Sequence, residues 1–218
     1  MIAGVDEAGR GPILGPLVIT GVMVHDEEAL RSFDVRDSKQ LSPQRRQVLA
    51  KKIKEHCLAF ETVIINASDI DDMRKVMTLN EIELNGYIKI ISKLKPTICY
   101  VDSVDVNAHR FGKEIAARIP KRCEIISEHK ADERYPVVSA ASILAKTIRD
   151  DQIHRIEQML QKKLNKPLGS GYPADPVTQN FLVTWVNQFG TLPPHTRHSW
   201  KTAKNILNRC KTKTLKDF

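Results

Sequence analysis

Residues 1–11 read MIAGVDEAGRG: a short apolar run, the adjacent carboxylates Asp6 and Glu7, and a basic turn between two glycines. The apolar residues 2–6 predict a buried strand. Two acids at the end of such a strand repel each other unless a cation lies between them. The stretch therefore predicts a metal site beside a loop that can approach a polyanion.

Two later segments repeat the pattern of an apolar strand followed by an acid. Residues 97–102 (TICYVD) predict a strand that ends at Asp102, and residues 123–127 (CEIIS) predict a strand followed by Asp132. Because the carboxyl ends of neighbouring strands meet at one edge of a sheet, these acids can converge with Asp6. Mg²⁺ or Mn²⁺ suits such oxygen ligands. Two such ions about 4 Å apart support phosphodiester hydrolysis.

The spacing leaves alternatives open for several of these acids. Side chains alternate along a strand, so Asp6 and Glu7 face opposite sides if the strand continues through both. Either the strand ends at Asp6 and the chain turns, or Glu7 acts partly through its backbone carbonyl. Asp132 precedes a predicted helix and can instead cap it, and Asp105 competes with Asp102 on spacing alone.

The remaining pattern predicts an α/β fold: a mixed five-stranded sheet flanked by helices, with a C-terminal helical lobe. Further strands are predicted at 17–24 and 61–66, and the first two strands are close enough to form an antiparallel hairpin. Helices are predicted at 43–57, 78–94, 110–118, 136–164, 176–190 and 195–208. We expect a core over about 1–165, a helical lobe over about 166–211 and a flexible tail at 212–218.

Composition narrows the class of protein. The 218 residues carry 34 Lys and Arg against 26 Asp and Glu, a net charge of +8. A basic surface around an acidic cluster suits an enzyme that binds phosphates, although solvated lysines account for the charge equally well. The four cysteines lack C-x-x-C spacing, so neither a zinc site nor a redox pair is predicted. We expect a cytoplasmic monomer without a signal peptide or a membrane span.

Six blocks resemble the signature of the type 2 ribonucleases H. They occur in family order: DEAGRGP from residue 6, DSKQL from 37, YVDS from 100, EHKAD from 128, AASILAK from 140 and GSGYPADP from 169. Any one block is weak evidence for the family, whereas six blocks in the same order over residues 1 to about 200 are specific evidence for it. The compact chain with its short C-terminal lobe is similar to the archaeal single-chain members.

The resemblance implies a ribonuclease H-like fold and a metal-dependent endonuclease that acts in DNA replication and repair. Its substrate would be RNA in an RNA–DNA hybrid, including a single ribonucleotide embedded in duplex DNA, and its products would carry 3′-hydroxyl and 5′-phosphate ends. Two Mg²⁺ or Mn²⁺ ions would serve as cofactors. The catalytic and metal-binding positions of the family match Asp6, Glu7, Asp102 and Asp132.

The resemblance also implies substrate-binding residues. The turn of Gly9, Arg10 and Gly11 matches the loop that reads the 2′-hydroxyl, and Tyr172 matches a tyrosine that stacks on the sugar at the RNA–DNA junction. Glycine amides can approach a hydroxyl closely because no Cβ intervenes, and the 2′-hydroxyl separates RNA from DNA. An exposed ring at Tyr172 can stack, although a ring folded onto the core is the alternative.

Basic side chains near these blocks are further candidates. Lys39, Lys130 and Lys146 suit phosphate contacts, as any surface lysine does. His129 can assist proton transfer near the metals or play a structural part.

The C-terminal residues 211–218 resemble a sliding-clamp-binding box. Leu215 and Phe218 occupy its apolar positions, whereas Thr212 replaces the usual glutamine and the second aromatic is missing. A sliding clamp is therefore a candidate partner, and a frayed basic terminus is the alternative.

Three rival functions compete with the nuclease. A dinucleotide-binding module fails on spacing, because the glycine after Gly11 is Gly15 and prolines interrupt the helix that should follow. A non-catalytic nucleic-acid-binding protein gains nothing from acids that face phosphates. Another two-metal nuclease or phosphotransferase of similar fold is compatible with the acids but not favoured by the glycine turn and Tyr172.

Overall fold

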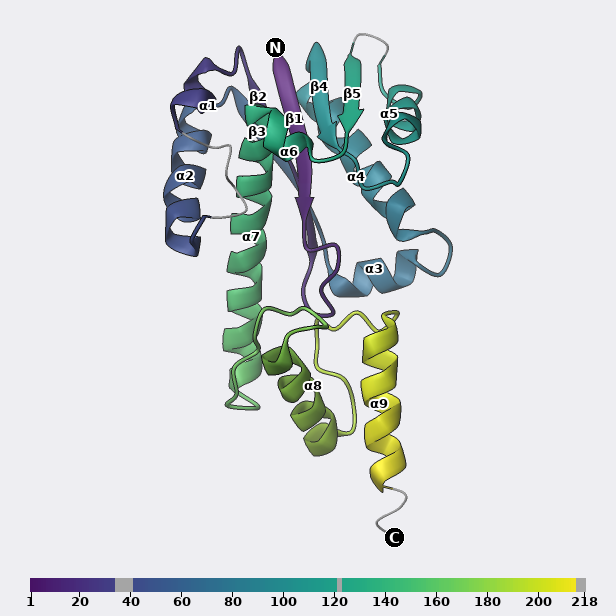
Figure 1. The fold of residues 1–218 in the computed structure, drawn as a ribbon. Helices are drawn as coiled ribbons and strands as arrows, with labels where there is room; N and C mark the ends of the chain where they lie inside the picture. The colour runs from purple at the N-terminus through teal and green to yellow at the C-terminus, as the bar shows by residue number, and fades with distance from the viewer. Residues whose placement is uncertain (34–40, 121–122, 215–218) are drawn as a thin grey trace. The chain divides into compact units, whose positions relative to one another are not determined.

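The computed structural model describes residues 1–33, 41–120 and 123–214. Within these residues the strands are β1 (Ile2–Ala8), β2 (Leu17–Val24), β3 (Ala59–Ile65), β4 (Ile98–Asp102) and β5 (Glu124–Glu128). The helices are α1 (Glu28–Ser32), α2 (Pro43–His56), α3 (Ala67–Met73), α4 (Leu79–Leu94), α5 (Ala108–Ala116), α6 (Ala131–Arg134), α7 (Pro136–Gln161), α8 (Pro176–Phe189) and α9 (Lys201–Thr214) (Figure 1).

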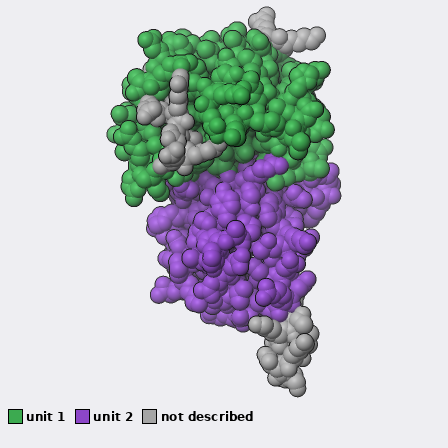
Figure 2. Space-filling view, viewed as in Figure 1, with its two compact units in different colours: residues 1–8, 18–64, 78–148 green, residues 9–17, 65–77, 149–218 purple. Residues whose placement is uncertain are grey.

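The described chain divides into two compact units that are interleaved along the sequence (Figure 2). Unit 1 comprises residues 1–8, 18–64 and 78–148, and unit 2 comprises residues 9–17, 65–77 and those from 149 onward. The predicted division at about residue 165 stays a prediction. Unit 2 includes the early segment 9–17 because its apolar side chains pack with C-terminal helices, a long-range contact that no local pattern announces.

The sheet of unit 1 confirms the predicted mixed five-stranded topology. Its strand order is β3-β2-β1-β4-β5 (Figure 1). β1 pairs antiparallel with β2, as the short connection predicts, and β1, β4 and β5 pair in parallel. The three strands predicted to end in or near acids are therefore neighbours, and their carboxyl ends lie at one edge of the sheet.

Helices cover both faces of this sheet. On one face α7 packs closely on β1, since a Cβ on Gly4 would lie 2.4 Å from the backbone of Val137. On the other face α4 packs on β1 and β2, since a Cβ on Gly21 would lie 2.4 Å from Ile90. α5 lies beside β5, with Gly112 against Ser127. The contact with α7 places the even-numbered residues of β1 on the α7 side.

Local capping explains where several helices begin and end. Thr78 and Glu81 form the predicted capping box of α4, with a 2.6 Å bond from the Thr78 amide to the Glu81 carboxylate. Gly190 ends α8 with φ 72°. The prediction of a helix from residue 195 is wrong, because α9 begins at Lys201 and the residues before it form turns. The short helices α1, α3 and α6 were not predicted.

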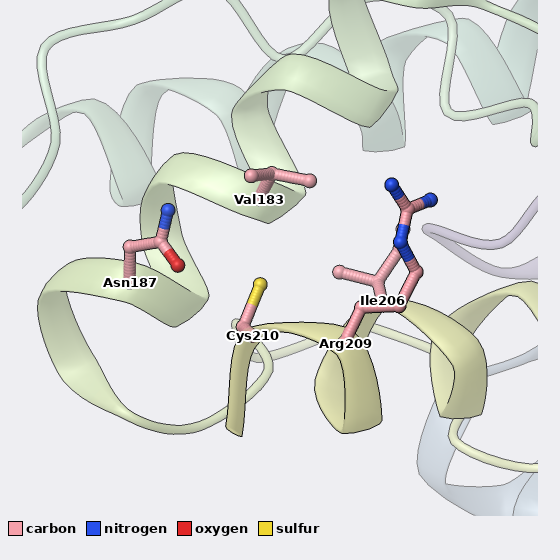
Figure 3. A pocket seen from close by; sticks show the side chains of 5 residues that line it. All are labelled: Val183, Asn187, Ile206, Arg209 and Cys210. Atoms are coloured by element: carbon pink, nitrogen blue, oxygen red, sulfur yellow. The ribbon is translucent and has the colours of Figure 1, made fainter. Parts of the chain in front are cut away.

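Unit 2 has its own apolar core, built by side chains of α7, α8, α9 and the early segment. Its buried members include Leu14, Ile156, Phe181, Trp185 and Ile206. A cavity of about 50 Å³ lies between α8 and α9, lined by Val183, Asn187, Ile206, Arg209 and Cys210 (Figure 3). It is too small for a nucleotide and contains none of the predicted site residues.

A membrane span finds no support in the described part of the chain, where no helix combines the length and the apolar character that a bilayer requires.

Candidate active site

β1 carries Asp6 and Glu7 on opposite faces of the sheet. The strand does not end at Asp6 but continues to Ala8, in unbroken register with β2. The alternation of side chains therefore holds through both acids, and the expectation that the chain turns after Asp6 is wrong. The alternative in which Glu7 acts partly through its backbone carbonyl stays a prediction. Asp6 lies on the α7 side, where the Ser142 side chain bonds to it, and Glu7 lies on the α4 side, where Tyr87 bonds to it.

Asp6 is a buried carboxylate whose ionisation is opposed by its surroundings. Its side chain is 5% exposed, and the amide of Glu7 donates to its Oδ1 at 2.7 Å. Burial raises the pKa of Asp6 well above its ordinary range, and the negative charges of Glu7 and Asp102 raise this pKa further. The bond from Ser142 opposes this rise only in part. A bound cation would reverse the repulsion among these acids.

Asp102 lies beside Asp6, on the same side of the sheet. The parallel pairing aligns Val5 with Val101, so the next residue of each strand, Asp6 and Asp102, is at the same level. The amide of Ala131 donates to Oδ1 of Asp102 at 2.9 Å, which ties the end of β4 to the start of α6. The two strands thus place two carboxylates together, as predicted.

Asp132 follows Ala131 in the first turn of α6 and is 4% exposed. Lys130 occupies the N-cap position with a left-handed backbone (φ 58°), and α7 begins only at Pro136. Asp132 is therefore not the N-cap of either helix, which removes the capping alternative. Its position next to Ala131 brings it to the same sheet edge as Asp102.

Asp105, the rival of Asp102, has a structural part. Its carboxylate accepts two bonds from Arg110 Nη2, at 2.6 and 2.7 Å, and one from the amide of Asn107 at 2.8 Å. The bond from Arg110 lowers the pKa of Asp105, and the Asn107 amide adds to the effect. These bonds fix the loop between β4 and α5 and favour Asp102 as the functional acid.

Tyr87 is a site residue that sequence reasoning missed. Its hydroxyl donates to Oε2 of Glu7 at 2.6 Å and lies 3.2 Å from the carbonyl oxygen of Asp102. The side chain is fully buried, and burial together with the charges of Glu7 and Asp6 raises the pKa of Tyr87, so the phenol stays protonated. A buried tyrosine needs a partner for its hydroxyl, but α4 alone does not reveal which one.

The donor chemistry of the sheet edge fits a hard divalent cation. Asp6 and Asp102 supply carboxylate oxygens on one side of the sheet, and the charge of Asp102 adds to burial and to the charge of Glu7 in raising the pKa of Asp6. Within the residues that the structure describes, no three His, Cys, Asp or Glu side chains already converge closely enough to hold a metal by themselves. The carboxylate of Glu7 lies on the α4 side of β1, where Tyr87 holds it, and its charge still acts on Asp6.

In unit 2, Arg197 fixes the glycine turn that follows β1. Its fully buried guanidinium donates to the carbonyl oxygens of Gly9, Arg10 (2.9 Å) and Gly15 (3.0 Å). Across a trans peptide the N–H points opposite to the C=O. The amides of Arg10 and Gly11 therefore point away from Arg197 and form a pair of neighbouring donors. Sequence reasoning missed Arg197, because it lies in the segment predicted as helix.

Tyr172 is an exposed aromatic beside the same turn. Its side chain is 42% exposed, which argues against a ring folded onto the core. The guanidinium of Arg149 lies 5.2 Å from the ring centroid, and Arg149 also donates to the carbonyl of Ser170 at 2.9 Å. A Cβ on Gly11 would lie 3.6 Å from the Tyr172 ring. Unit 2 thus brings together two predicted substrate-binding elements.

The loop that carries Tyr172 is fixed by Asp175. This carboxylate accepts bonds from the amide and the hydroxyl of Ser170, both at 2.7 Å, and from the amide of Val177 at 2.9 Å. The Ser170 amide and hydroxyl contribute most to lowering the pKa of Asp175 to about 2. The loop is therefore held at any pH at which the enzyme would work.

The other predicted residues are less informative. Lys146 is half-buried on α7, and Lys130 is exposed at the turn before α6. His129 Nε2 lies 3.2 Å from the carbonyl of Val106, a contact that suits a structural part. Lys39 and the tail residues, Leu215 and Phe218, lie outside the described residues.

Comparison with known proteins identifies the family to which this chain belongs. A family model described as Ribonuclease HII matches residues 3–203 of the 218-residue chain. The chain belongs to the ribonuclease HII family. It is therefore a hydrolytic endonuclease of the ribonuclease H type, which confirms the predicted enzyme class and excludes the dinucleotide-binding and non-catalytic alternatives.

Relatives of similar length support this assignment. A curated ribonuclease HII from Methanoregula boonei is 45% identical over 218 residues and covers 100% of both chains. The crystal structure of ribonuclease H2 from Pyrococcus horikoshii OT3 matches with TM-score 0.88 and 39% identity, over 96% of this chain and 98% of that one. A PCNA:RNase HII complex from Archaeoglobus fulgidus matches with TM-score 0.86 and 42% identity, over 100% of both chains.

Proposed function

We propose that this ribonuclease HII cleaves RNA in RNA–DNA hybrids and at single ribonucleotides embedded in duplex DNA, and that it uses two Mg²⁺ or Mn²⁺ ions. The products carry 3′-hydroxyl and 5′-phosphate ends. The observation that carries the proposal is the buried Asp6 beside Asp102 at the ends of paired strands, where burial and the charges of Glu7 and Asp102 oppose its ionisation. A bound cation would offset this cost.

The acids at the sheet edge are the proposed metal ligands: Asp6, Glu7, Asp102 and Asp132. Ions held by these residues would supply activation of a water molecule and stabilisation of the leaving oxygen of the phosphodiester. The chain's own part is to hold the carboxylates in place. The Glu7 amide donates to Asp6 and the Ala131 amide donates to Asp102. Asp132 follows Ala131 in the first turn of α6, and we assign it as the fourth ligand.

The turn after β1 is the proposed reader of the sugar. The paired amides of Arg10 and Gly11 are directed away from Arg197 and can donate to a 2′-hydroxyl oxygen. The exposed ring of Tyr172 can stack on the sugar at the RNA–DNA junction. Gly9 comes two positions after Glu7. The proposed metal ligands of β1 and the turn proposed to read the sugar are therefore almost adjacent in the sequence. We assign Lys39 and Lys146 to phosphate contacts.

One cleavage experiment tests the proposal. Three duplexes are incubated with Mg²⁺, Mn²⁺ or EDTA and their ends are mapped: one with a single ribonucleotide, one RNA–DNA hybrid and one all-DNA control. Cleavage should need metal and a ribonucleotide, and Asp6→Asn should abolish it. Asp105→Asn is the matched control. Asp105 binds Arg110 and fixes the loop between β4 and α5, so this variant should retain activity. Cleavage in EDTA or cleavage of the all-DNA duplex would overturn the proposal.

We also propose a sliding clamp as the partner of residues 211–218, with Leu215 and Phe218 as the apolar contacts. The support is the tail sequence and the PCNA complex of the related Archaeoglobus fulgidus protein. Titration of the 211–218 peptide into the clamp of the same organism should show binding that Phe218→Ala removes. Absence of binding at high micromolar concentration would refute the tail as the contact.

The cellular setting that we propose is a cytoplasmic monomer that serves DNA replication and repair. All four cysteines are free thiols, which suits a reducing compartment. Analytical ultracentrifugation with and without a ribonucleotide-containing duplex tests the oligomeric state. The free protein should sediment with the mass of one chain, and twice that mass would contradict a monomer.

A further inference from the structure

The structure leaves one question about the acidic pair: what holds the Glu7 carboxylate. Asp6 and Glu7 lie on opposite faces of β1, so Glu7 does not share the contacts that fix Asp6. A glutamate side chain has three rotatable bonds and loses several rotamers when it becomes ordered. Without a fixed partner it would have to pay this entropy cost when a metal binds.

Tyr87 supplies that partner. Its hydroxyl donates to only one of the two carboxylate oxygens of Glu7, Oε2, at 2.6 Å. The same hydroxyl lies 3.2 Å from the carbonyl oxygen of Asp102. A single buried hydroxyl therefore spans the ends of β1 and β4, the two strands that carry three of the four proposed metal ligands.

Tyr87 is itself held rigidly. Its ring is fully buried on α4 and packs edge-on against Phe111, with the ring centroids 5.3 Å apart. α4 in turn packs on the sheet through Gly86, where a Cβ would lie 2.3 Å from the Ile19 side chain. The hydroxyl is thus fixed from both ends, by its ring and by the strands.

The choice of a neutral donor is chemically informative. A lysine or arginine at this position would pair with Glu7 and cancel the negative charge that attracts a cation. A phenol hydroxyl donates a hydrogen bond and leaves the carboxylate charged. This is the property that a group behind a metal ligand needs, since such groups orient ligands without competing for the ion.

We propose that Tyr87 is a positioning residue: it fixes the Glu7 carboxylate at the ends of β1 and β4, and this placement supports metal binding at the sheet edge. The inference rests on the proposed function, because it assumes that Glu7 is a ligand. Tyr87 touches neither substrate nor metal and acts only through Glu7.

The primary test measures metal binding without substrate. Mn²⁺ is titrated calorimetrically into the wild-type protein and Tyr87→Phe, which removes one oxygen and keeps the ring. We expect the Mn²⁺ affinity of the variant to fall about 10-fold or more, the usual effect of losing a group that orients a ligand. Tyr100→Phe, which removes a hydroxyl on the α7 side of the same sheet, is the matched control and should bind Mn²⁺ like the wild type.

A double-mutant cycle separates positioning from a general structural effect. In a Glu7→Gln background, Tyr87→Phe should cause no further loss of Mn²⁺ affinity. An equal loss in both backgrounds, or an unchanged affinity in Tyr87→Phe, would overturn the positioning role. If Glu7→Gln alone leaves Mn²⁺ affinity and cleavage intact, the ligand role of Glu7 in the proposed function fails instead.

Discussion

Arg197 donates to the backbone carbonyl of Gly9, a residue 188 positions earlier in the chain. With its bonds to Arg10 and Gly15, it holds three carbonyls of one turn from a fully buried position. An arginine suits this task because its planar fork has five donors in fixed directions. The direction of the turn's amides is thus determined by a residue near the other end of the amino-acid sequence.

Replacing Arg197 should damage the turn even when the charge is kept. Arg197→Lys retains a cation, but a single ammonium cannot reach three carbonyls in the same geometry. We expect the free energy of unfolding to fall by about 2–3 kcal/mol, the range for leaving buried acceptors unpaired. Urea unfolding measures this loss. Arg110→Lys, which changes a mostly exposed arginine and keeps a cation beside Asp105, is the control and should change stability by less than about 1 kcal/mol. Equal stabilities of Arg197→Lys and the wild type would contradict the role of Arg197 in stabilising the turn after β1.

The two glycines of the turn should respond differently to alanine. Gly11→Ala places its Cβ 3.6 Å from the Tyr172 ring, an ordinary contact, so the variant should fold normally. Gly9→Ala should unfold more easily, because φ is +87° and the Cβ would lie 2.5 Å from the Pro16 carbonyl. If the turn contacts the sugar, Gly11→Ala should still lose cleavage at a single ribonucleotide, because its methyl group occupies the approach. Full activity in a stable Gly11→Ala would contradict substrate reading by this turn.

In the metal-free protein at neutral pH, the buried Asp6 should lower the free energy of unfolding. Its pKa in the folded state is raised above its ordinary value of 3.8, so the folded state binds the proton more tightly than the unfolded chain does. The contribution of Asp6 to the free energy of unfolding is therefore greatest below its ordinary pKa and is lost as the pH rises through the raised pKa. Asp6→Asn should unfold at a higher temperature than the wild type at neutral pH in EDTA, while its activity falls at least about 100-fold. A lower melting temperature would show that the pKa of Asp6 is not raised.

Metal binding should release a proton in the same pH range. A carboxylate must be deprotonated to bind a cation, so Mn²⁺ affinity should weaken as the pH falls through the raised pKa of Asp6. Calorimetry in two buffers with different ionisation enthalpies counts the released protons. The release should be smaller in Asp6→Asn, and affinity that is independent of pH would contradict the prediction.

Much of the fold could be predicted because its signals are local. The capping box at Thr78, the apolar strands and the short link between β1 and β2 each depend on neighbouring residues. The acids Asp6 and Asp102 could be paired because strand ends meet at one sheet edge. Asp105 could be set aside only with the structure, where Arg110 binds it.

The parts that could not be predicted depend on distant contacts. Arg197 clamps a turn at the other end of the chain, and Tyr87 reaches Glu7 across 80 positions. The segment before Lys201 is predicted as the first turn of the last helix, yet its residues form turns, and Arg197 in it bonds to the turn after β1. Local propensity gives way where such tertiary bonds dominate.

The alternation of Asp6 and Glu7 makes the register of β1 part of the site. A slip of the whole strand by one residue against β2 and β4 would move each of its residues to the opposite face of the sheet. The aspartate would then face the helix that carries Tyr87, and the glutamate would face Ser142 on the other side. Both acids would still be encoded, in the same order, in a protein that had exchanged their surroundings. The pairing of β1 with its neighbours therefore decides which surroundings each acid receives, as firmly as the identity of the two residues does.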